Sequence, residues 1–358
     1  MSAQNQPLVY VISPVYNGER YLRECIEAVL AQTYTNWQYT ILNNCSKDRS
    51  LEIAREYAVR DPRIRVVDSD TFRGMIANFE YGTSLMPAEA RYLKFAFCDD
   101  QLLPECLQQM VSIGESDPQI AIVGCYVLNG TRILSRGVPF GTQVVPGRLP
   151  CRSYLLNGES PFESLNGLMV RAEVVRRRGR LHARDDGLFE DLDVCFDLLR
   201  DAKFGFAHQV LAFNRRDNES TLSRIRNYNP MLLSDMVFLY RYAQTYLSPE
   251  ERRLMWDWKS RQYWDFLARS TLKRADAGFW KFHHAGMRQM QFPFSRARLA
   301  LSILRVLLDY VLNPKMSCER LFGRLKPQRP PPPADDESPG ESSALAPPAS
   351  HSAGKGVS

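Results

Sequence analysis

Two places in the sequence hold adjacent carboxylates that could carry chemistry, and the first is Asp99-Asp100. This pair follows the largely apolar run Arg91 to Phe97, which has the pattern of a buried strand. Two carboxylates at such a strand end repel each other, so a cation or hydrogen bonds must offset the repulsion. Hard oxygen ligands suit Mg²⁺ or Mn²⁺ shared with substrate phosphates. The alternative interpretation is a turn that caps the helix expected near Pro104.

The second place is Glu190-Asp191, just before the helix expected over Leu192 to Arg200. A carboxylate that its neighbours hold in place can act as a general base and take a proton from an attacking hydroxyl. Carboxylates are also favourable in the first turn of a helix, so capping is the alternative interpretation. Neither pair is diagnostic by itself.

The elements that would position these residues alternate along the first part of the chain. Periodic patterns predict strands at 8–12, 39–42, 63–67, 91–97 and 120–127, and helices at 19–31, 47–59, 74–85 and from Pro104 onward. Repeated strand–helix units favour an α/β fold with a mostly parallel sheet and helices on both faces. Ligands bind such sheets at the carboxyl ends of the strands, where polar loops are expected at 14–18, 43–48 and 99–100.

Composition and length set further bounds. With 358 residues, the chain is long enough for one large domain and an appendage. Its eight cysteines show no CxxC spacing, which favours reduced thiols and a cytoplasmic location. No signal peptide and no apolar run long enough for a transmembrane helix is visible. The net charge of +6 suits anionic ligands or an anionic membrane, and we expect no nucleic-acid partner.

In their order along the chain, these motifs resemble the inverting glycosyltransferase family 2. The opening P-x-[YF]-N pattern of that family falls on residues 14–17, and its S-[IV]-L-x-Q-[ST]-[YF] pattern on residues 28–34. Its D-D-x-S-x-D turn falls on residues 43–48. Its metal motif and acceptor-side motifs fall on Asp99-Asp100 with Pro104, on Gly167, and on Glu190-Asp191. The resemblance covers residues 8 to 220.

The resemblance implies a GT-A fold, a Rossmann-like nucleotide-sugar-binding domain, with a nucleotide-diphosphate sugar as donor. Pro14, Tyr16 and Asn44 would line the nucleoside pocket, and Arg73 is a further candidate there. The basic residues Arg215 and Arg216 stand where family members often carry basic or histidine side chains near the donor phosphates.

The same resemblance assigns the metal and the acceptor side. Asp99 would contact the ribose or the metal, and Asp100 would coordinate the Mn²⁺ or Mg²⁺ that bridges the diphosphate. Asp191 would be the catalytic base, with Glu190 and Gly167 shaping the acceptor side. One carboxylate suffices for a single in-line displacement that inverts the anomeric centre. We therefore expect transfer of a sugar to a hydroxyl of a glycan or lipid-linked acceptor, in surface polysaccharide biosynthesis.

Two positions depart from the family pattern. Asn43-Asn44 replaces the usual pair of aspartates, which indicates a different nucleotide preference because an amide both donates and accepts hydrogen bonds. Phe97 replaces the first Asp of the D-x-D motif. The alternative hypothesis is a catalytically silent GT-A module that binds nucleotide sugar or glycan. A nucleotidyltransferase fits less well, because a Gly-rich basic loop after the first strand is missing.

The rest of the chain differs in composition. We expect a GT-A domain over 1–225, a helical C-terminal region over 226–326 and a disordered tail over 327–358. The basic stretch 171–184 is interpreted as a solvated helix face and loop, or alternatively as a contact for a diphosphate-lipid acceptor. The apolar segment within 296–315 is interpreted as a packed helix, or alternatively as a peripheral contact at the inner face of the membrane.

Overall fold

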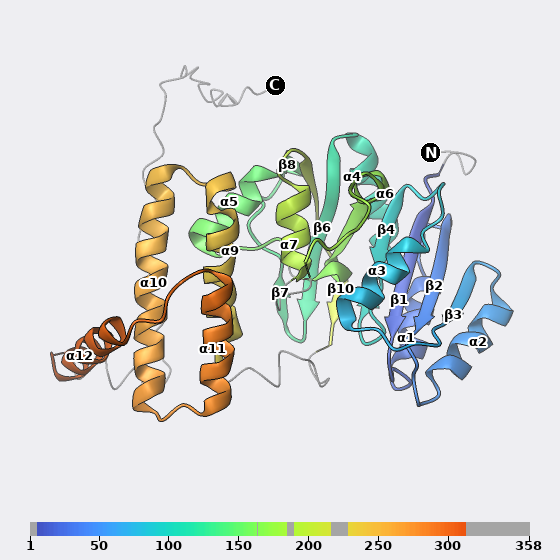
Figure 1. Ribbon diagram of the computed structural model, residues 1–358. Coiled ribbons are helices and arrows are strands. Elements are labelled where there is room, and N and C mark those ends of the chain that lie inside the picture. The colour runs from blue at the N-terminus through green and yellow to red at the C-terminus, as the bar shows by residue number, and fades with distance from the viewer. Residues whose placement is uncertain (1–5, 163, 185–189, 216–227, 313–358) are drawn as a thin grey trace, which may run out of the picture.

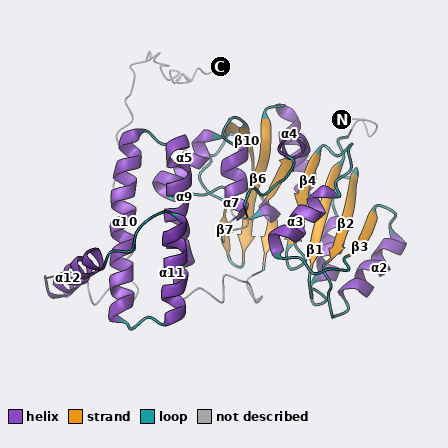
Figure 2. Ribbon diagram, in the orientation of Figure 1, coloured by secondary structure: helices purple, strands orange, loops and turns teal. Residues whose placement is uncertain are grey.

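A computed structural model describes residues 6–162, 164–184, 190–215 and 228–312. One mixed sheet with helices on both faces forms the first part, and a group of helices follows it at one end (Figure 1). Figure 2 shows the strands side by side in one layer, with α3 (Met75–Ser84) and α7 (Glu190–Leu198) across the near face.

The sheet has the order β3-β2-β1-β4-β9-β6-β10-β5, with β7 paired to β6 and β8 paired to β10. Its strands are β1 (Val9–Val15), β2 (Trp37–Asn43), β3 (Ile64–Asp68), β4 (Tyr92–Phe95), β5 (Gln101–Leu102), β6 (Ile120–Asn129), β7 (Arg132–Leu134), β8 (Val144–Pro146), β9 (Leu168–Arg171) and β10 (Lys203–Asn214). β3, β2, β1 and β4 are parallel, as are β6 and β10. β9 is antiparallel to both of its neighbours, β4 and β6. The predicted mostly parallel sheet is confirmed.

Side chains alternate along the central strands between two apolar cores. Val9 and Val11 of β1 face one core, and Tyr10 and Ile12 face the other, as the two-residue period of a strand requires. The first core is covered by α1 (Leu22–Leu30), α2 (Ser50–Arg60) and α4 (Cys106–Ser116). The second is covered by α3, α5 (Arg148–Asn157), α6 (Ala172–Arg178) and α7. Burial on both faces explains the continuous apolar runs of the strands.

The helices after the sheet are α9 (Pro230–Tyr246), α10 (Pro249–Leu272), α11 (Ala277–Gln289) and α12 (Arg296–Leu312). α9 packs on α5, and Phe238 and Tyr242 of α9 enter the second core of the sheet. Trp264 and Phe279 belong to a further core among α9, α10 and α11. Across the described ranges, every helix is too short or too polar to cross a membrane.

The interpretation of the stretch 171–184 as solvated is wrong at Arg171. This side chain is only 4% exposed, and its Nε donates a hydrogen bond to the Ile120 carbonyl at 2.6 Å. Because the Arg171 guanidinium donates to a buried backbone carbonyl, it stabilises the start of β6 and cannot contact an acceptor substrate. Arg216 and the tail predicted at 327–358 lie outside the described residues.

Candidate active site

The loops that follow β1 and β2 lie side by side, because these strands are parallel neighbours and end at the same edge. Side chains of each loop bind backbone N–H groups of the other. Lys47 N–H donates to Asn17 Oδ1 at 2.8 Å, and Gly18 N–H donates to Ser50 Oγ at 2.8 Å. These bonds give the first two predicted ligand loops one fixed relative position.

Tyr16 presents an aromatic surface beside these loops. Its side chain is 51% exposed, and its ring meets the ring of Phe72 edge to face with 5.0 Å between centroids. Phe72 is itself 57% exposed. Pro14, two residues before Tyr16 near the end of β1, is half-buried. Exposed rings at a strand end suit the flat face of a nucleobase. Sequence reasoning missed Phe72, although an aromatic residue in the polar loop after β3 was a signal for it.

Asn44 holds the loop that carries Arg73. Asn44 is buried, its Nδ2 donates to the Arg73 carbonyl at 2.9 Å, and its Oδ1 accepts from the Arg73 N–H at 2.9 Å. The Arg73 guanidinium packs over the Tyr81 ring and donates to Ser69 Oγ at 3.0 Å. In this geometry Asn44 acts on the predicted nucleoside pocket through the backbone of Arg73.

Asp99 and Asp100 follow β4 at the same edge of the sheet. Asp100 is 8% exposed, and its Oδ1 accepts a hydrogen bond from the Arg215 backbone N–H at 3.0 Å. Burial and the adjacent Asp99 carboxylate raise the pKa of Asp100 to about 7, against the lowering effect of Arg215 and Lys94. The alternative that the pair caps α4 is excluded, because β5 lies between them and no side chain caps that helix.

The donor set of this pair fits a divalent cation. Two neighbouring carboxylates, one of them buried, are hard oxygen ligands whose repulsion a cation would relieve. Among the described residues, no three His, Cys, Asp or Glu side chains gather into a complete metal site. One or two carboxylates combined with substrate phosphates is the usual way in which proteins hold Mg²⁺.

Phe97, which stands where the family motif has an aspartate, belongs to an aromatic cluster. Its ring lies 5.8 Å from that of Phe95 and 5.5 Å from that of Phe79 on α3. Phe79 in turn lies 5.9 Å from the ring of His182. The departure therefore adds apolar packing between β4 and α3 beside the carboxylate pair.

The turn that contains Gly167 is fixed to the end of β4 by a buried lysine. Lys94 is fully buried, and its Nζ donates to the Asn166 carbonyl in η2 (Leu165–Gly167). Asn166 Nδ2 donates to Asn214 Oδ1 at 2.9 Å, so β10 also holds the turn. A Cβ added at Gly167 would lie 2.5 Å from Val127 Cγ2, so a larger residue would have to displace that side chain or the turn. A lysine inside an apolar strand was the signal that sequence reasoning missed.

Asp191 is the most accessible carboxylate at the start of α7. Its side chain is 32% exposed, and its Oδ2 accepts a hydrogen bond from the Leu165 N–H at 3.2 Å. Glu190 is only 4% exposed, and so is Asp193, whose carboxylate binds Arg241 and Tyr242. Of these three acids, Asp191 is the one placed to meet a ligand.

The described residues thus meet at one edge of the sheet. β9 is antiparallel to β4, so the η2 turn just before β9 lies beside the carboxyl end of β4, where Asp99 and Asp100 follow. The hydrogen bond from Leu165 then brings Asp191 to the same turn. The predicted donor-side and acceptor-side residues are joined through Lys94 and η2.

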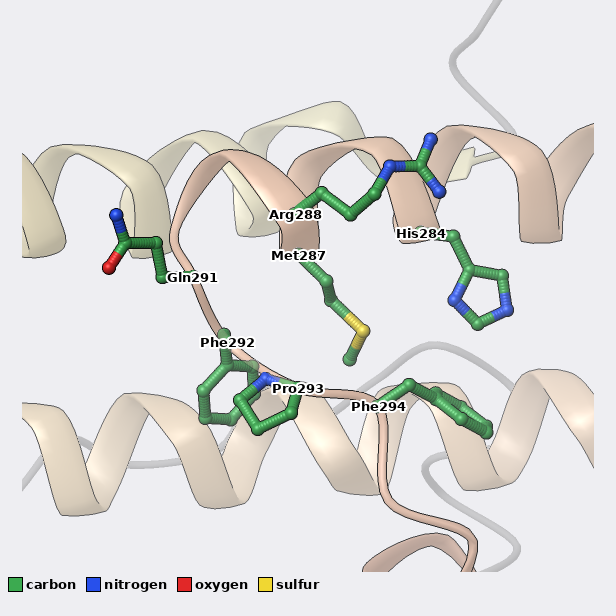
Figure 3. A pocket seen from close by; sticks show the side chains of 7 residues that line it. All are labelled: His284, Met287, Arg288, Gln291, Phe292, Pro293 and Phe294. Carbon is green, nitrogen blue, oxygen red and sulfur yellow. The ribbon is translucent and has the colours of Figure 1, made fainter.

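A pocket of about 330 Å³ lies elsewhere, on α11 and the loop after it (Figure 3). It is lined by His284, Met287, Arg288, Gln291, Phe292, Pro293 and Phe294. These residues include no carboxylate that could act as a base or hold a divalent cation, so this pocket is separate from the strand-end site.

Comparison with known proteins agrees with this architecture. Residues 10–173 match the profile of the family described as glycosyl transferase family 2. The putative glycosyltransferase EpsE of Bacillus subtilis is 27% identical over 226 residues, which cover 61% of this chain and 76% of EpsE. The uncharacterized glycosyltransferase EpsJ of the same organism is 36% identical over 119 residues, a third of each chain. The match to EpsJ therefore covers much less than the whole of that relative.

Solved structures share the fold. The crystal structure of S. aureus TarS residues 1–349 in complex with UDP-GlcNAc has a TM-score of 0.58 at 16% identity, over 85% of this chain and 91% of that one. The mannosyltransferase PcManGT of Pyrobaculum calidifontis, in complex with GDP-Man and Mn²⁺, has a TM-score of 0.52 at 14% identity, over 89% and 85%. Residues 10–173 of this chain thus match glycosyl transferase family 2, and the sheet described above has the GT-A fold that these solved structures share.

Proposed function

We propose that this glycosyltransferase moves one sugar, with inversion, from a nucleotide-diphosphate sugar to a hydroxyl of a glycan or lipid-linked acceptor during surface polysaccharide assembly. The observation that carries the proposal is one half-exposed carboxylate, Asp191, tethered to the sheet edge that also holds Asp99 and Asp100. The names of relatives support the setting, since one is a putative teichuronic acid biosynthesis glycosyltransferase, TuaG of Bacillus subtilis.

The donor nucleoside would lie along the β1 and β2 loops. Pro14 and Tyr16 form one wall, Phe72 extends its aromatic surface, and Arg73 stands on the loop that Asn44 fixes. TarS and PcManGT were solved with UDP-GlcNAc and GDP-Man, which supports a nucleotide-sugar donor for this chain as well.

The donor diphosphate would lie next to Asp100. Asp100, with Asp99, would hold Mn²⁺ or Mg²⁺, and Asp99 would also contact the ribose. A divalent cation there neutralises charge that develops on the nucleoside diphosphate as it leaves. The Arg215 backbone N–H donates to the Asp100 carboxylate, and its Nε donates to the Asp99 backbone carbonyl, so Arg215 orients Asp100 and holds the backbone of the pair.

Asp191 would then act as the base. It accepts the proton of the acceptor hydroxyl while that oxygen bonds to the anomeric carbon and the carbon–oxygen bond to the diphosphate breaks. The buried Glu190 and the close-packed Gly167 would shape the acceptor side of the same site. A single carboxylate is sufficient, because the leaving group departs as a stabilised anion without needing an acid.

A thermal-shift screen tests the proposal. The panel holds UDP-, dTDP-, GDP- and CDP-sugars with and without Mn²⁺, for wild type, Asp100→Ala and Asp191→Asn. We expect one nucleotide class to raise the Tm of wild type with metal, Asp100→Ala to abolish the shift, and Asp191→Asn to keep it. No shift with any donor and metal would refute the transferase. Donor binding followed by normal turnover in Asp191→Asn would refute the base assignment.

α12 supports a peripheral contact with an anionic membrane as part of this function. Leu301, Leu304, Leu308 and Val311 recur at helical spacing and are 49% to 75% exposed, whereas only Ser302 and Val306 of this helix are buried. The exposed arginines at 296 and 298 begin the same helix, which gives it the basic and apolar character of an interfacial helix.

Co-sedimentation with vesicles tests this contact. Wild type should bind vesicles with about a third phosphatidylglycerol and not pure phosphatidylcholine, and Leu304→Glu with Leu308→Glu should abolish binding. Leu254→Glu, at another exposed leucine, is the matched control. Dimerisation that the α12 variant removes, without vesicle binding, would instead assign this face to a second copy of the chain.

A further inference from the structure

A buried histidine connects the proposed base to α3. His182 is 1% exposed, and its Nδ1 lies 2.8 Å from Glu80 Oε1. Its other ring nitrogen, Nε2, lies 3.8 Å from Asp191 Oδ1 and has no hydrogen-bond partner within the described part of the chain. A buried polar atom of this kind needs an explanation, and the nearby carboxylate supplies one.

The two neighbours decide the charge of the ring. A neutral imidazole carries one N–H and one lone pair, and a lone pair facing a carboxylate is repulsive. With a carboxylate near each nitrogen, the favoured ring is the imidazolium, which donates to Glu80 from Nδ1 and faces Asp191 Oδ1 with a positively charged N–H across 3.8 Å. Burial by itself would lower the pKa of His182, but Asp191 and Glu80 together raise it to about 9.

Glu80 of α3 holds the backbone of His182 as well as its ring. Its Oε1 accepts the His182 backbone N–H at 2.6 Å, and its Oε2 accepts the Leu181 N–H at 3.1 Å. Arg180 Nε donates to the His182 carbonyl at 2.6 Å. The segment Leu181–His182 is therefore attached to α3 through both oxygens of Glu80.

We propose that His182 is a positioning residue that holds Asp191 ionised and oriented for proton abstraction. The proposal rests on the function proposed above. His182 acts on Oδ1 while the Leu165 N–H acts on Oδ2, so both oxygens are held and each keeps a lone pair for the acceptor hydroxyl. His182 is already protonated, so the proton taken from the acceptor stays on Asp191 until product leaves. This differs from arrangements in which histidine itself accepts the proton.

The first test needs no substrate. Protein labelled with ¹⁵N-histidine is titrated by NMR, and loss of one signal in His182→Gln assigns that residue. We expect His182 to be an imidazolium at pH 7.5 and to titrate near pH 9. His283 is the matched control, because it is equally buried but burial lowers its pKa to about 4. If His182→Gln fails to fold, substitution of each of the four other histidines assigns the His182 signal by elimination, and a neutral His182 at pH 7.5 would then still overturn the proposal.

The second test uses turnover of the donor that the thermal-shift screen identifies. His182→Gln should lower kcat about tenfold to a hundredfold, within the contribution of a general base, and leave the donor KM and donor-induced Tm shift unchanged. The acid limb of its kcat–pH profile should move to higher pH, because Asp191 loses a cationic neighbour. His283→Gln should leave the profile in place.

The outcomes separate the two proposals. An unchanged profile in His182→Gln, with Asp191→Asn inactive, would refute the role of His182 and leave the transferase intact. A fully active Asp191→Asn would refute the base and the role of His182 together. A lower Tm with an unshifted profile would make His182 merely structural.

Discussion

Asp193 Oδ1 accepts a hydrogen bond from Tyr242 Oη at 2.6 Å, which joins α7 to α9 two residues after the proposed base. Arg241 Nη1 donates to the other oxygen of the same carboxylate at 2.7 Å. The carboxylate is 4% exposed, so these partners replace the water it would otherwise bind. The position of α7 therefore depends on the helical region as well as on the sheet.

Tyr242→Phe should destabilise the protein because it removes the buried hydroxyl that donates to Asp193 and Asp197, which then keep only their arginine partners. The expected loss is about 1–3 kcal/mol in the free energy of unfolding, measured by urea titration. Tyr240→Phe on the same helix is the control, since Tyr240 is 42% exposed. Equal stability of the two variants would contradict the role of this hydrogen bond.

Gly167→Ala should lower stability by about 1–3 kcal/mol, because the new methyl group would overlap Val127 Cγ2 at 2.5 Å. Sugar transfer should fall with it, since η2 carries the N–H that holds Asp191. Gly74→Ala is the control, because an added Cβ there meets no atom within 4 Å. Thermal melts and sugar-transfer assays on both variants test this prediction. A stable, fully active Gly167→Ala would show that the η2 turn can accommodate a methyl group.

Removal of divalent metal should abolish the stabilisation by donor. At a donor concentration of a hundred times Kd, wild type with Mn²⁺ should gain about 2.7 kcal/mol, and excess EDTA should return it to the ligand-free Tm. Asp100→Asn should behave like the chelated protein. Asp117→Asn removes a carboxylate that pairs with Lys203 at the amino end of β10, whereas Asp100 lies near its carboxyl end, and it should keep the full shift. A donor shift that survives EDTA would rule out the metal.

Stability should fall as pH rises above neutrality because of His182. Its pKa is raised from 6.5 to about 9 in the folded chain, so it stabilises fully below pH 6.5 and loses that contribution as pH rises through 9. The difference corresponds to about 3 kcal/mol. Urea titrations at pH 6.5 and 9.5 should show a gap between wild type and His182→Gln that shrinks at the higher pH. A difference in the free energy of unfolding that is the same at both pH values would contradict the raised pKa of His182.

Protonation of His283 should lower the stability of the protein on the acid side of its pH profile. Burial lowers its pKa to about 4, so the neutral ring stabilises the fold at neutral pH and protonation costs stability as pH falls from 6.5 toward 4. His283→Gln should therefore flatten the acid side of the stability profile and leave the alkaline side to His182. An acid limb that this substitution does not change would assign it to other groups.

Local patterns predicted the strands and helices on the donor side and the loops between them. The runs around Val9 and Ile41 are apolar because both faces of the sheet are covered, and that signal is local. The direction of β9 was not predictable, because it depends on pairing with β4 and β6 over long sequence separations. Long-range contacts also decide that Asn44 binds the Arg73 backbone.

The residues of the candidate site also fall into two groups: those that local motifs predicted and those that only long-range packing brings together. Asp100 and Asp191 were found from motifs, since their types and spacing are written along the chain. His182 was predicted only as part of a basic stretch, because its burial and its partner Glu80, 102 residues away, arise from the packing of α3. These placements in the structure are consistent with the predicted roles, which the variants above test.

The antiparallel direction of β9 also matters for how such enzymes can diversify. After β6 the chain adds the short strands β7 and β8 beside β6 and β10 and then returns as β9 between β4 and β6, so this excursion is anchored to the sheet at both ends. Insertions or exchanges within it can change length and chemistry without altering the register of β1 to β4. We expect a chimera that takes this excursion from a relative to gain that relative's acceptor preference and to keep its original donor.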